Sequence, residues 1–335
     1  NYQIMIKKSA WLDEIEVAKG IAIFLVVFGH IADRGVSPEF YSEAYVTIKT
    51  IIYSFHMPFF FFLSGVVAFY SVRGGTVSTI DRLKRSVPRI LYPYFIFGIV
   101  TVTLKVFLDG GSIYEAIESY SLLIISPLNP IVGSVWYLYV LFIYIALTPV
   151  FSFMEKKIDH GIYIALLMLF FLDIGKLGQY FALSLVIKYL LFFYLGKYYI
   201  DNRADIKRKI SNLSAPVFFT ILITFFIVSY FYTSEFKEVQ ILMIFLSFIL
   251  LIKVAISIGK LQDFLKILGR NTLAIYLLSP FIIGMAKKLL LFIDNFNGGL
   301  FFIAAIVITI ASIWVPILIK ELSKEKFTPL HTLIK

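Results

Sequence analysis

The sequence predicts an all-α fold, a polytopic membrane helical bundle of about ten transmembrane helices that forms one domain over residues 1–335. Hydrophobic residues make up 60% of the chain and charged residues only 16%, whereas soluble domains are roughly 45–50% apolar. Apolar runs recur along the whole chain, and most approach the ~20 residues that a helix needs to cross the hydrocarbon. The charged residues fall mainly between these runs.

The expected spans follow the apolar runs in order. A backbone in lipid must satisfy its own hydrogen bonds, so each run is predicted to be helical, and "FFFFLSGVVAF" lacks the alternation of a membrane β-barrel. The predicted spans are residues 17–32, 50–70, 90–108, 135–153, 161–173, 178–199, 215–232, 241–258, 272–292 and 300–319. The fifth run is short, so it and the sixth are alternatively one helical hairpin around Asp173. Before the fourth span, "SIYEAIESYSLLI" predicts a short amphipathic helix along the membrane interface.

The distribution of lysine and arginine predicts the orientation. With the N-terminus inside, most of the 31 Lys and Arg residues fall in cytoplasmic connections, and the longest outside connection, residues 109–134, contains none. This bias places both termini in the cytoplasm and predicts a multi-pass protein of the inner (plasma) membrane. The lipid bilayer is therefore an expected partner. Because the net charge of +10 follows the topology, we expect no nucleic-acid partner.

The first span, "AKGIAIFLVVFGH", carries a lysine near its start and a histidine at its end. Lys19 and His30 are eleven residues apart, which at ~100° per residue puts both on one helix face, about 16 Å apart along the axis. Ionisable groups inside a bilayer are costly and usually mark a functional site. The alternatives are that Lys19 extends to the headgroups and that His30 only bonds a neighbour.

His56 lies in "SFHMPFFFFLSG" of the second span, at a depth similar to that of His30 because a short connection joins the two helices. Two nearby imidazoles can serve as a general base and its orienting partner. Alternatively, the imidazole of His56 bonds backbone that Pro58 frees. Ser64 and Gly65 follow and allow close helix approach. No third metal ligand is evident and the chain has no Cys, so we expect neither a metal nor a thiol nucleophile.

Three arginines occur in "DRLKRSVPRILYPY", at the cytoplasmic mouth of the third span. Arg82, Arg85 and Arg89 follow an i, i+3, i+7 spacing and so form one helical stripe. Planar guanidinium groups bind phosphates in bidentate fashion, which predicts an anion site. Pro88 and Pro93 are expected to bend the helix there. The alternative is ordinary positive-inside anchoring.

The order and spacing of several motifs resemble the acyltransferase-3 family of integral membrane proteins. The motifs are "AKGIAIFLVVFGH", "FHMPFFFFLSG", "RSVPRILYPY", "VWYLYVLF" and "LGRNTLAIYLLSPF", which together cover roughly residues 11–280. The second motif is similar to that of members that modify bacterial surface sugars, such as fucose 4-O-acetylase-like proteins. Many members have a His after the "YLL" of the last motif, where this chain has Ser279, so no role is assigned to that position.

The resemblance implies an acyl-CoA donor, acetyl-CoA in the simplest case, and a catalytic role for His30, as general base or as a transient acyl carrier. Lys19 matches the basic residue of the first motif, in a place more often held by Arg, and would help to fix the donor. Arg85 and Arg89, with Arg82, would hold the CoA phosphates. Trp136 and Tyr137 either line the sugar site or belong to the interfacial aromatic belt.

The sequence therefore predicts a membrane O-acyltransferase that acts on a hydroxyl of a cell-surface or lipid-linked glycan, with His30, Lys19 and His56 in its catalytic site. The alternative is a glycan or lipid transporter or flippase, because a basic polytopic protein with buried ionisable groups also fits that function. A transporter would favour pseudo-symmetric broken helices, whereas the Lys–His pair and the arginine stripe favour the enzyme.

Overall fold

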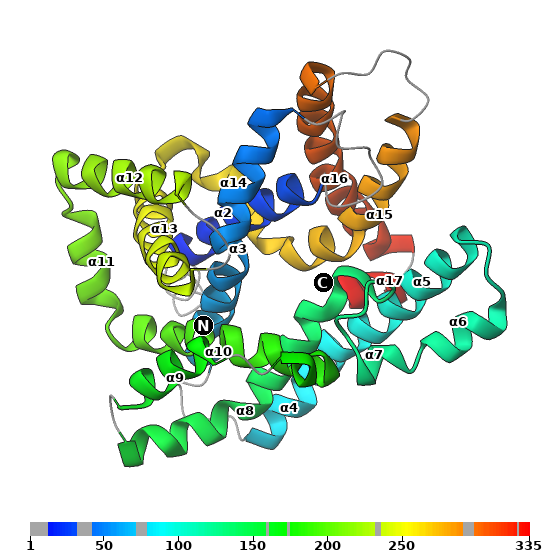
Figure 1. The fold of residues 1–335 in the computed structure, drawn as a ribbon, viewed down its shortest axis with the longest axis horizontal. Helices are drawn as coiled ribbons and strands as arrows, with labels where there is room; N and C mark the ends of the chain where they lie inside the picture. Colours follow the sequence, from blue (N-terminus) through cyan, green and yellow to red (C-terminus); the bar gives the residue numbers. More distant parts are fainter. Residues whose placement is uncertain are drawn as a thin grey trace. The chain divides into compact units, whose positions relative to one another are not determined.

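The computed structural model describes residues 13–31, 42–71, 79–158, 161–172, 175–231, 236–290, 298–326 and 328–335. Throughout these ranges the regular secondary structure is helical and no strand occurs (Figure 1). The predicted all-α fold class is therefore confirmed.

Seven stretches of the described chain are long and apolar enough to cross a membrane. They are Glu43–Tyr70, Leu83–Leu108, Gly133–Phe151, Gly178–Asp201, Lys237–Ser257, Thr272–Leu290 and Gly299–Lys324. These correspond to the second, third, fourth, sixth, eighth, ninth and tenth predicted spans. An eighth crossing results if Arg203–Ser211 and Ala215–Tyr230, which meet at a bend of 96°, form one span. The chain is thus a multi-pass membrane protein.

The two remaining predicted spans are helices of a different character. The helix Asp13–His30 has 18 residues, but its first two turns carry Asp13, Glu14, Glu16 and Lys19. The helix Gly161–Phe171 has only 11 residues, which at ~1.5 Å per residue covers about half of the ~30 Å hydrocarbon thickness. An apolar run in the sequence marks a buried helix whether or not that helix is long enough to span the bilayer. The prediction of ten spans thus exceeds the seven or eight that the described chain supports by length and composition.

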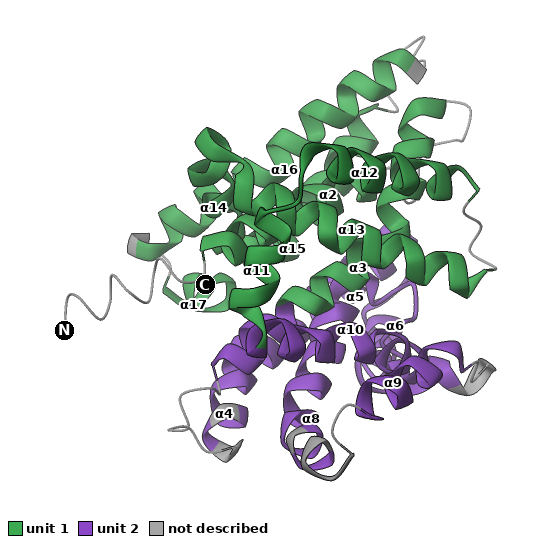
Figure 2. Cartoon of the chain, turned by 90° about the vertical axis from the view of Figure 1, so that its left-hand side faces the viewer, with its two compact units in different colours: residues 1–63, 202–335 green, residues 64–201 purple. Residues whose placement is uncertain are grey.

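By contact the chain divides into two compact units, coloured green and purple in Figure 2. Unit 1 comprises Asn1–Leu63 and Asn202–Lys335, and unit 2 comprises Ser64–Asp201. Unit 1 contains α2 (Asp13–His30), the first part of α3 (Glu43–Tyr70), α11 (Arg203–Ser211), α12 (Ala215–Tyr230), α13 (Lys237–Ser257), η5 (Gly259–Leu261), α14 (Gln262–Arg270), α15 (Thr272–Leu290), α16 (Gly298–Lys326) and α17 (Thr328–Ile334).

Unit 2 contains the rest of α3 and the elements that follow it. These are α4 (Thr79–Ser86), η2 (Val87–Leu91), α5 (Tyr92–Leu108), α6 (Ile113–Ser119), α7 (Leu122–Ile125), η3 (Gly133–Val135), α8 (Trp136–Ile158), α9 (Gly161–Phe171), η4 (Gly175–Ala182) and α10 (Leu183–Asp201). Helices α6 and α7 together cover the segment where the sequence predicts one short helix before the fourth span. Ser112 caps α6, because its hydroxyl accepts the backbone N–H of Glu115 and donates to the Glu115 carboxylate.

Helix α2 lies in the core of unit 1, where it contacts α13, α14, α15 and α16. Helices α2 and α14 can approach this closely only because a glycine of each helix faces the backbone of the other. A Cβ on Gly20 would lie 2.0 Å from the Leu265 carbonyl oxygen, and a Cβ on Gly269 would lie 1.9 Å from the Glu16 carbonyl oxygen. The two helices therefore touch backbone to backbone at reciprocal positions.

A similar contact holds unit 2 together. A Cβ on Gly65 in α3 would lie 1.9 Å from the Phe193 carbonyl oxygen in α10, so the close helix approach predicted at this glycine is confirmed. The Tyr144 hydroxyl of α8 donates to the Val186 carbonyl of α10 at 2.7 Å. These contacts fix α3, α8 and α10 within this unit.

Candidate active site

His30 is the last residue of α2, and its surroundings hold that helix end in place. The buried Tyr45 hydroxyl donates to the Phe28 carbonyl at 2.6 Å, which satisfies one of the free carbonyls at the helix C-terminus. Gly29 leaves room for the Tyr53 ring, since a Cβ there would lie 2.9 Å from a carbon of that ring. The sequence thus brings α3 close to His30 by placing a glycine next to it.

Three rings from α2 and α3 gather around this point. The Tyr53 hydroxyl lies 2.9 Å from Nδ1 of His30. The His56 ring packs edge-on to His30, with centroids 6.2 Å apart, and it lies 4.7 Å from the Tyr53 ring. His56 is buried, whereas His30 and Tyr53 are half-buried. The predicted proximity of the two histidines is confirmed, and Tyr53 joins them.

The hydrogen bonds of the two histidines constrain where their protons lie. His56 Nδ1 is 3.0 Å from the Ile52 carbonyl oxygen, and a carbonyl only accepts, so Nδ1 of His56 carries a proton. This carbonyl is not the one that Pro58 frees, because a missing N–H at residue 58 releases the carbonyl of Ser54. At His30, Nδ1 can donate to the Tyr53 oxygen, and in that tautomer of the neutral ring the basic lone pair is on Nε2.

This arrangement has the parts of a general-base site. An imidazole base needs a lone pair on one nitrogen and a partner on the other nitrogen that fixes the ring. Tyr53 can supply that partner for His30, and the ring of His56 packs against both. The ammonium of Lys49, one turn before Tyr53, lies 5.0 Å from the centre of the Tyr53 ring and adds a cation–π contact.

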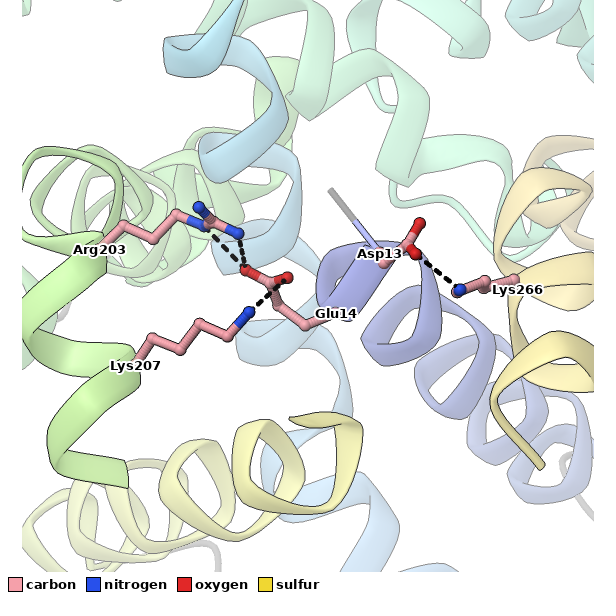
Figure 3. Close-up of polar contacts among 5 residues, drawn as sticks. All are labelled: Asp13, Glu14, Arg203, Lys207 and Lys266. Carbon is pink, nitrogen blue, oxygen red and sulfur yellow. Dashed lines mark hydrogen bonds and ion pairs between the residues drawn. The ribbon is translucent and has the colours of Figure 1, made fainter. Parts of the chain in front are cut away.

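The opposite end of α2 is anchored by charge, as Figure 3 shows. Glu14 is almost fully buried, and its carboxylate bonds Arg203 and lies 3.5 Å from the Lys207 ammonium. Both cations stand on α11. On the other side, Lys266 of α14 donates to Asp13 at 2.7 Å. Acidic residues in a first turn also complement the helix dipole. These pairs fix the start of the helix whose far end carries His30.

Lys19 lies between these two ends and is ion-paired. Its ammonium is 3.1 Å from the carboxylate of Glu16, one turn earlier, and both side chains are mostly buried. The same helix therefore carries Lys19 and His30, as predicted, with about 16 Å of helical rise between them. The pairing places Lys19 outside the three-ring cluster.

The predicted arginine stripe lies in unit 2, on α4 and η2. Arg85 and Arg89 are exposed, and the side chain of Arg82 lies outside the described residues. The turn at η2 is π-helical, with the Tyr92 N–H bonded to the Val87 carbonyl. In a regular α-helix, residues four apart are offset by ~40° around the helix axis. A π-helical turn holds more residues per turn, so the offset between Arg85 and Arg89 is smaller here.

The two prolines near the stripe lie at an irregular part of the helix. Pro88 lies inside the π-helical turn, and Pro93 lies at the start of α5. The segment Leu83–Leu108 nevertheless counts as one continuous helix. The π-helical turn thus coincides with Pro88, and such turns are a common place for a helix to bend.

The two predicted sugar-site aromatics begin α8 and have different surroundings. The Trp136 ring stacks on Tyr189, with centroids 6.3 Å apart. Tyr137 is buried, and its hydroxyl lies 2.5 Å from that of Ser64. The last motif contributes Gly269, which touches α2, and Ser279, which is buried in α15.

Tyr53 and the carboxylates at the start of α2 were not predicted from the sequence. Tyr53 resembles one more aromatic packing residue in an apolar run, and only the three-residue spacing to His56 could have drawn attention to it. Asp13 and Glu14 lie just before the predicted span and are paired with residues far along the chain. Within the described ranges, no group of three or more His, Asp or Glu side chains is arranged to hold a metal ion.

Comparison with known proteins adds one finding. A family model described as an acyltransferase domain matches residues 12–320. The match includes the three-ring cluster, the arginine stripe and the glycine contact between α2 and α14. No curated protein and no solved structure matches the chain.

Proposed function

We propose, since the chain belongs to the acyltransferase-3 family, that it transfers an acyl group from acyl-CoA to a hydroxyl of a cell-surface or lipid-linked glycan. Acetyl is the simplest acyl group for this reaction. The family match spans nearly the whole chain and supports membrane acyltransferase activity. The observation that supports a specific catalytic centre is the contact of Tyr53 with Nδ1 of His30, beside His56.

In the proposed step, His30 acts as the general base. Nε2 takes the proton of the acceptor hydroxyl while the hydroxyl oxygen attacks the thioester carbonyl carbon. A carbon–oxygen bond forms, the carbon–sulfur bond breaks, and the CoA thiolate leaves and takes the proton back from His30. Tyr53 would hold the imidazole by accepting the N–H of Nδ1, which also stabilises the imidazolium that forms.

The remaining predicted residues receive binding roles. Arg85 and Arg89, with Arg82, would bind the CoA phosphates from the cytoplasm, because their helix begins at a cytoplasmic connection in the predicted topology. Trp136 and Tyr137 would contact the sugar. The acceptor would approach from the outer side, where the connection 109–134 lacks Lys and Arg.

Sealed proteoliposomes of known orientation test this function. Acetyl-CoA with a labelled acetyl group is supplied on the cytoplasmic face only, and free CoA and labelled glycan are measured. We expect CoA release, and we expect mass spectrometry of cell-surface glycans to show acetyl esters that disappear when the gene is deleted. A flippase, the alternative, would move its glycan or lipid without releasing CoA. Absence of CoA release with every acyl-CoA tried would contradict the enzyme.

Replacing an arginine of the stripe should weaken donor binding. One charge-assisted hydrogen bond contributes about 1.5–3 kcal/mol, so Arg85→Ala or Arg89→Ala is expected to raise the Kd for CoA about tenfold or more. Lys should restore little, because it binds phosphate as a point charge and not as a fork. Isothermal titration of CoA into protein in nanodiscs measures this.

Arg208→Ala is the matched control for the stripe, since Arg208 is exposed and pairs with Asp205 on α11. It removes the same charge and should leave CoA affinity unchanged. Equal CoA affinity in wild type, Arg85→Ala and Arg89→Ala would contradict the proposal that the stripe binds the CoA phosphates.

Removing the Tyr53 hydroxyl should slow the chemical step. Tyr53→Phe keeps the ring but deletes the partner of His30 Nδ1, and one hydrogen bond of about 0.5–1.5 kcal/mol corresponds to a kcat up to about tenfold lower. The KM for acyl-CoA should not change, because Tyr53 has no proposed contact with the donor. Steady-state kinetics separate the two parameters. A raised KM with an unchanged kcat would mean that Tyr53 serves binding instead.

A further inference from the structure

Lys320 is a buried lysine near the cytoplasmic end predicted for α16. Only 8% of the residue surface is exposed. Helix α16 contacts both α2 and α17. The charged groups that act on Lys320 are Glu321 and Lys324 of its own helix and, more weakly, Lys19 of α2 and Lys335, which directly follows α17. Lysines from α2, from α16 and from the residue after α17 therefore lie in the same part of unit 1.

The carboxylates around these lysines are already paired. Glu16 bonds Lys19, with 3.1 Å between the groups, and Glu321 bonds Lys324 at 2.5 Å. Among the side chains that the structure describes, none forms an ion pair or hydrogen bond with the Lys320 ammonium. Most of the Lys320 residue is buried and its ammonium has no counter-ion among these groups, so an added anion would be stabilised here.

The backbone around Lys320 is held in place. Nδ1 of His331 donates to the Lys320 carbonyl at 3.2 Å and lies 3.5 Å from the Ser323 hydroxyl. These contacts join α17 to α16 and so bring Lys335 toward Lys320. The arrangement differs from a row of surface lysines, because Lys320 is buried and Lys19 belongs to α2, which packs against four other helices.

We propose that Lys320, with Lys19 and Lys335 beside it, forms a binding site for a phosphate group. An anion supplies the missing counter-charge, and a phosphate accepts hydrogen bonds from several ammonium groups at once. The phosphate can come from the acyl-CoA donor, in which case the inference rests on the proposed function, or from a phospholipid headgroup.

The test compares Lys320→Met with wild type in nanodiscs. Met keeps the length and apolar stem of the side chain and removes its charge. Lys209→Met is the matched control, because Lys209 is exposed and paired with Asp205 on α11. In phosphatidylcholine discs, isothermal titration measures the affinity for CoA and for 3′-dephospho-CoA. In a second arm without CoA, thermal unfolding is compared between phosphatidylcholine discs and discs that contain phosphatidylglycerol.

Two results support the site and separate its sources. If the donor is the source, Lys320→Met lowers CoA affinity about tenfold while Lys209→Met does not. If a lipid is the source, phosphatidylglycerol raises the melting temperature of wild type and Lys209→Met but not of Lys320→Met. The second arm remains informative when wild type binds no CoA, a result that would count against the proposed function alone.

One result overturns the site. It is excluded if Lys320→Met matches wild type in both arms. Should Lys320→Met fail to fold, Lys320→Arg and Lys335→Met take its place, since Lys335 is exposed. The Arg variant keeps the charge and should retain binding, whereas Lys335→Met should weaken it. Unchanged binding in Lys335→Met would then be the contradicting result.

Discussion

His30→Ala is expected to lower kcat by about 10²–10⁴-fold, because removal of a general base typically costs that much in rate. The imidazole lies at the end of α2, where Tyr53 and His56 surround it. CoA affinity should stay close to wild type, since the proposed donor contacts lie elsewhere. His56→Ala should also impair turnover. Measuring kcat and KM with purified protein checks both expectations.

Tyr45→Phe separates loss of the base from disturbance of the helix end. It removes the hydroxyl that donates to the Phe28 carbonyl, two residues before His30, but leaves the imidazole in place. This change should cost about 0.5–1.5 kcal/mol of stability and leave kcat within a few-fold of wild type. A His30→Ala protein that folds and turns over at nearly the wild-type rate would refute the base assignment.

The glycine contact between α2 and α14 should tolerate no methyl group. In Gly269→Ala the new carbon would lie 1.9 Å from the Glu16 carbonyl oxygen, and in Gly20→Ala it would lie 2.0 Å from that of Leu265. Overpacking costs typically 1–3 kcal/mol and more where the obstacle is backbone that cannot rotate away. We expect both variants to lose most of their folded yield or to unfold at a clearly lower temperature.

Gly284→Ala is the matched control for these variants. Gly284 lies within α15, and a Cβ there meets nothing within 4 Å. Because Ala is the better helix former, this variant should be unchanged or stabilised by up to about 1 kcal/mol. Thermal unfolding and size-exclusion profiles of detergent-solubilised protein compare the three. Wild-type melting temperatures for both Gly20→Ala and Gly269→Ala would show that α2 and α14 are farther apart than described.

The all-α fold and the His30–His56 proximity could be predicted because both follow from local rules. Apolar runs set the helices, and a short connection sets the two histidines at one depth. The number of crossings could not be predicted so well, since α9 is apolar but too short and α2 carries its charges inside the helix. Hydropathy measures burial, and burial in protein and burial in lipid give the same signal.

The parts of the candidate site that the sequence did not reveal depend on partners far along the chain. Tyr53 belongs to the candidate site because it contacts His30 on another helix. Gly20 looks like any small residue in an apolar run until the Leu265 carbonyl is placed against it. Glu14 looks like an interfacial carboxylate until Arg203 reaches it. A single sequence shows each of these residues but not which residue it contacts in the fold.

The ion pair of Glu14 also determines when the start of α2 can be stabilised during synthesis. Glu14 and Arg203 are separated by 189 residues, and Asp13 and Lys266 by 253. At the ~5–20 residues per second of a ribosome, Glu14 emerges about 10–40 s before Arg203. For that interval Asp13 and Glu14 have neither of these cations, so the helix that ends in His30 can complete its long-range ion pairs only after unit 2 has been made. Nascent chains stalled before residue 203 should therefore hold α2 less firmly than released ones.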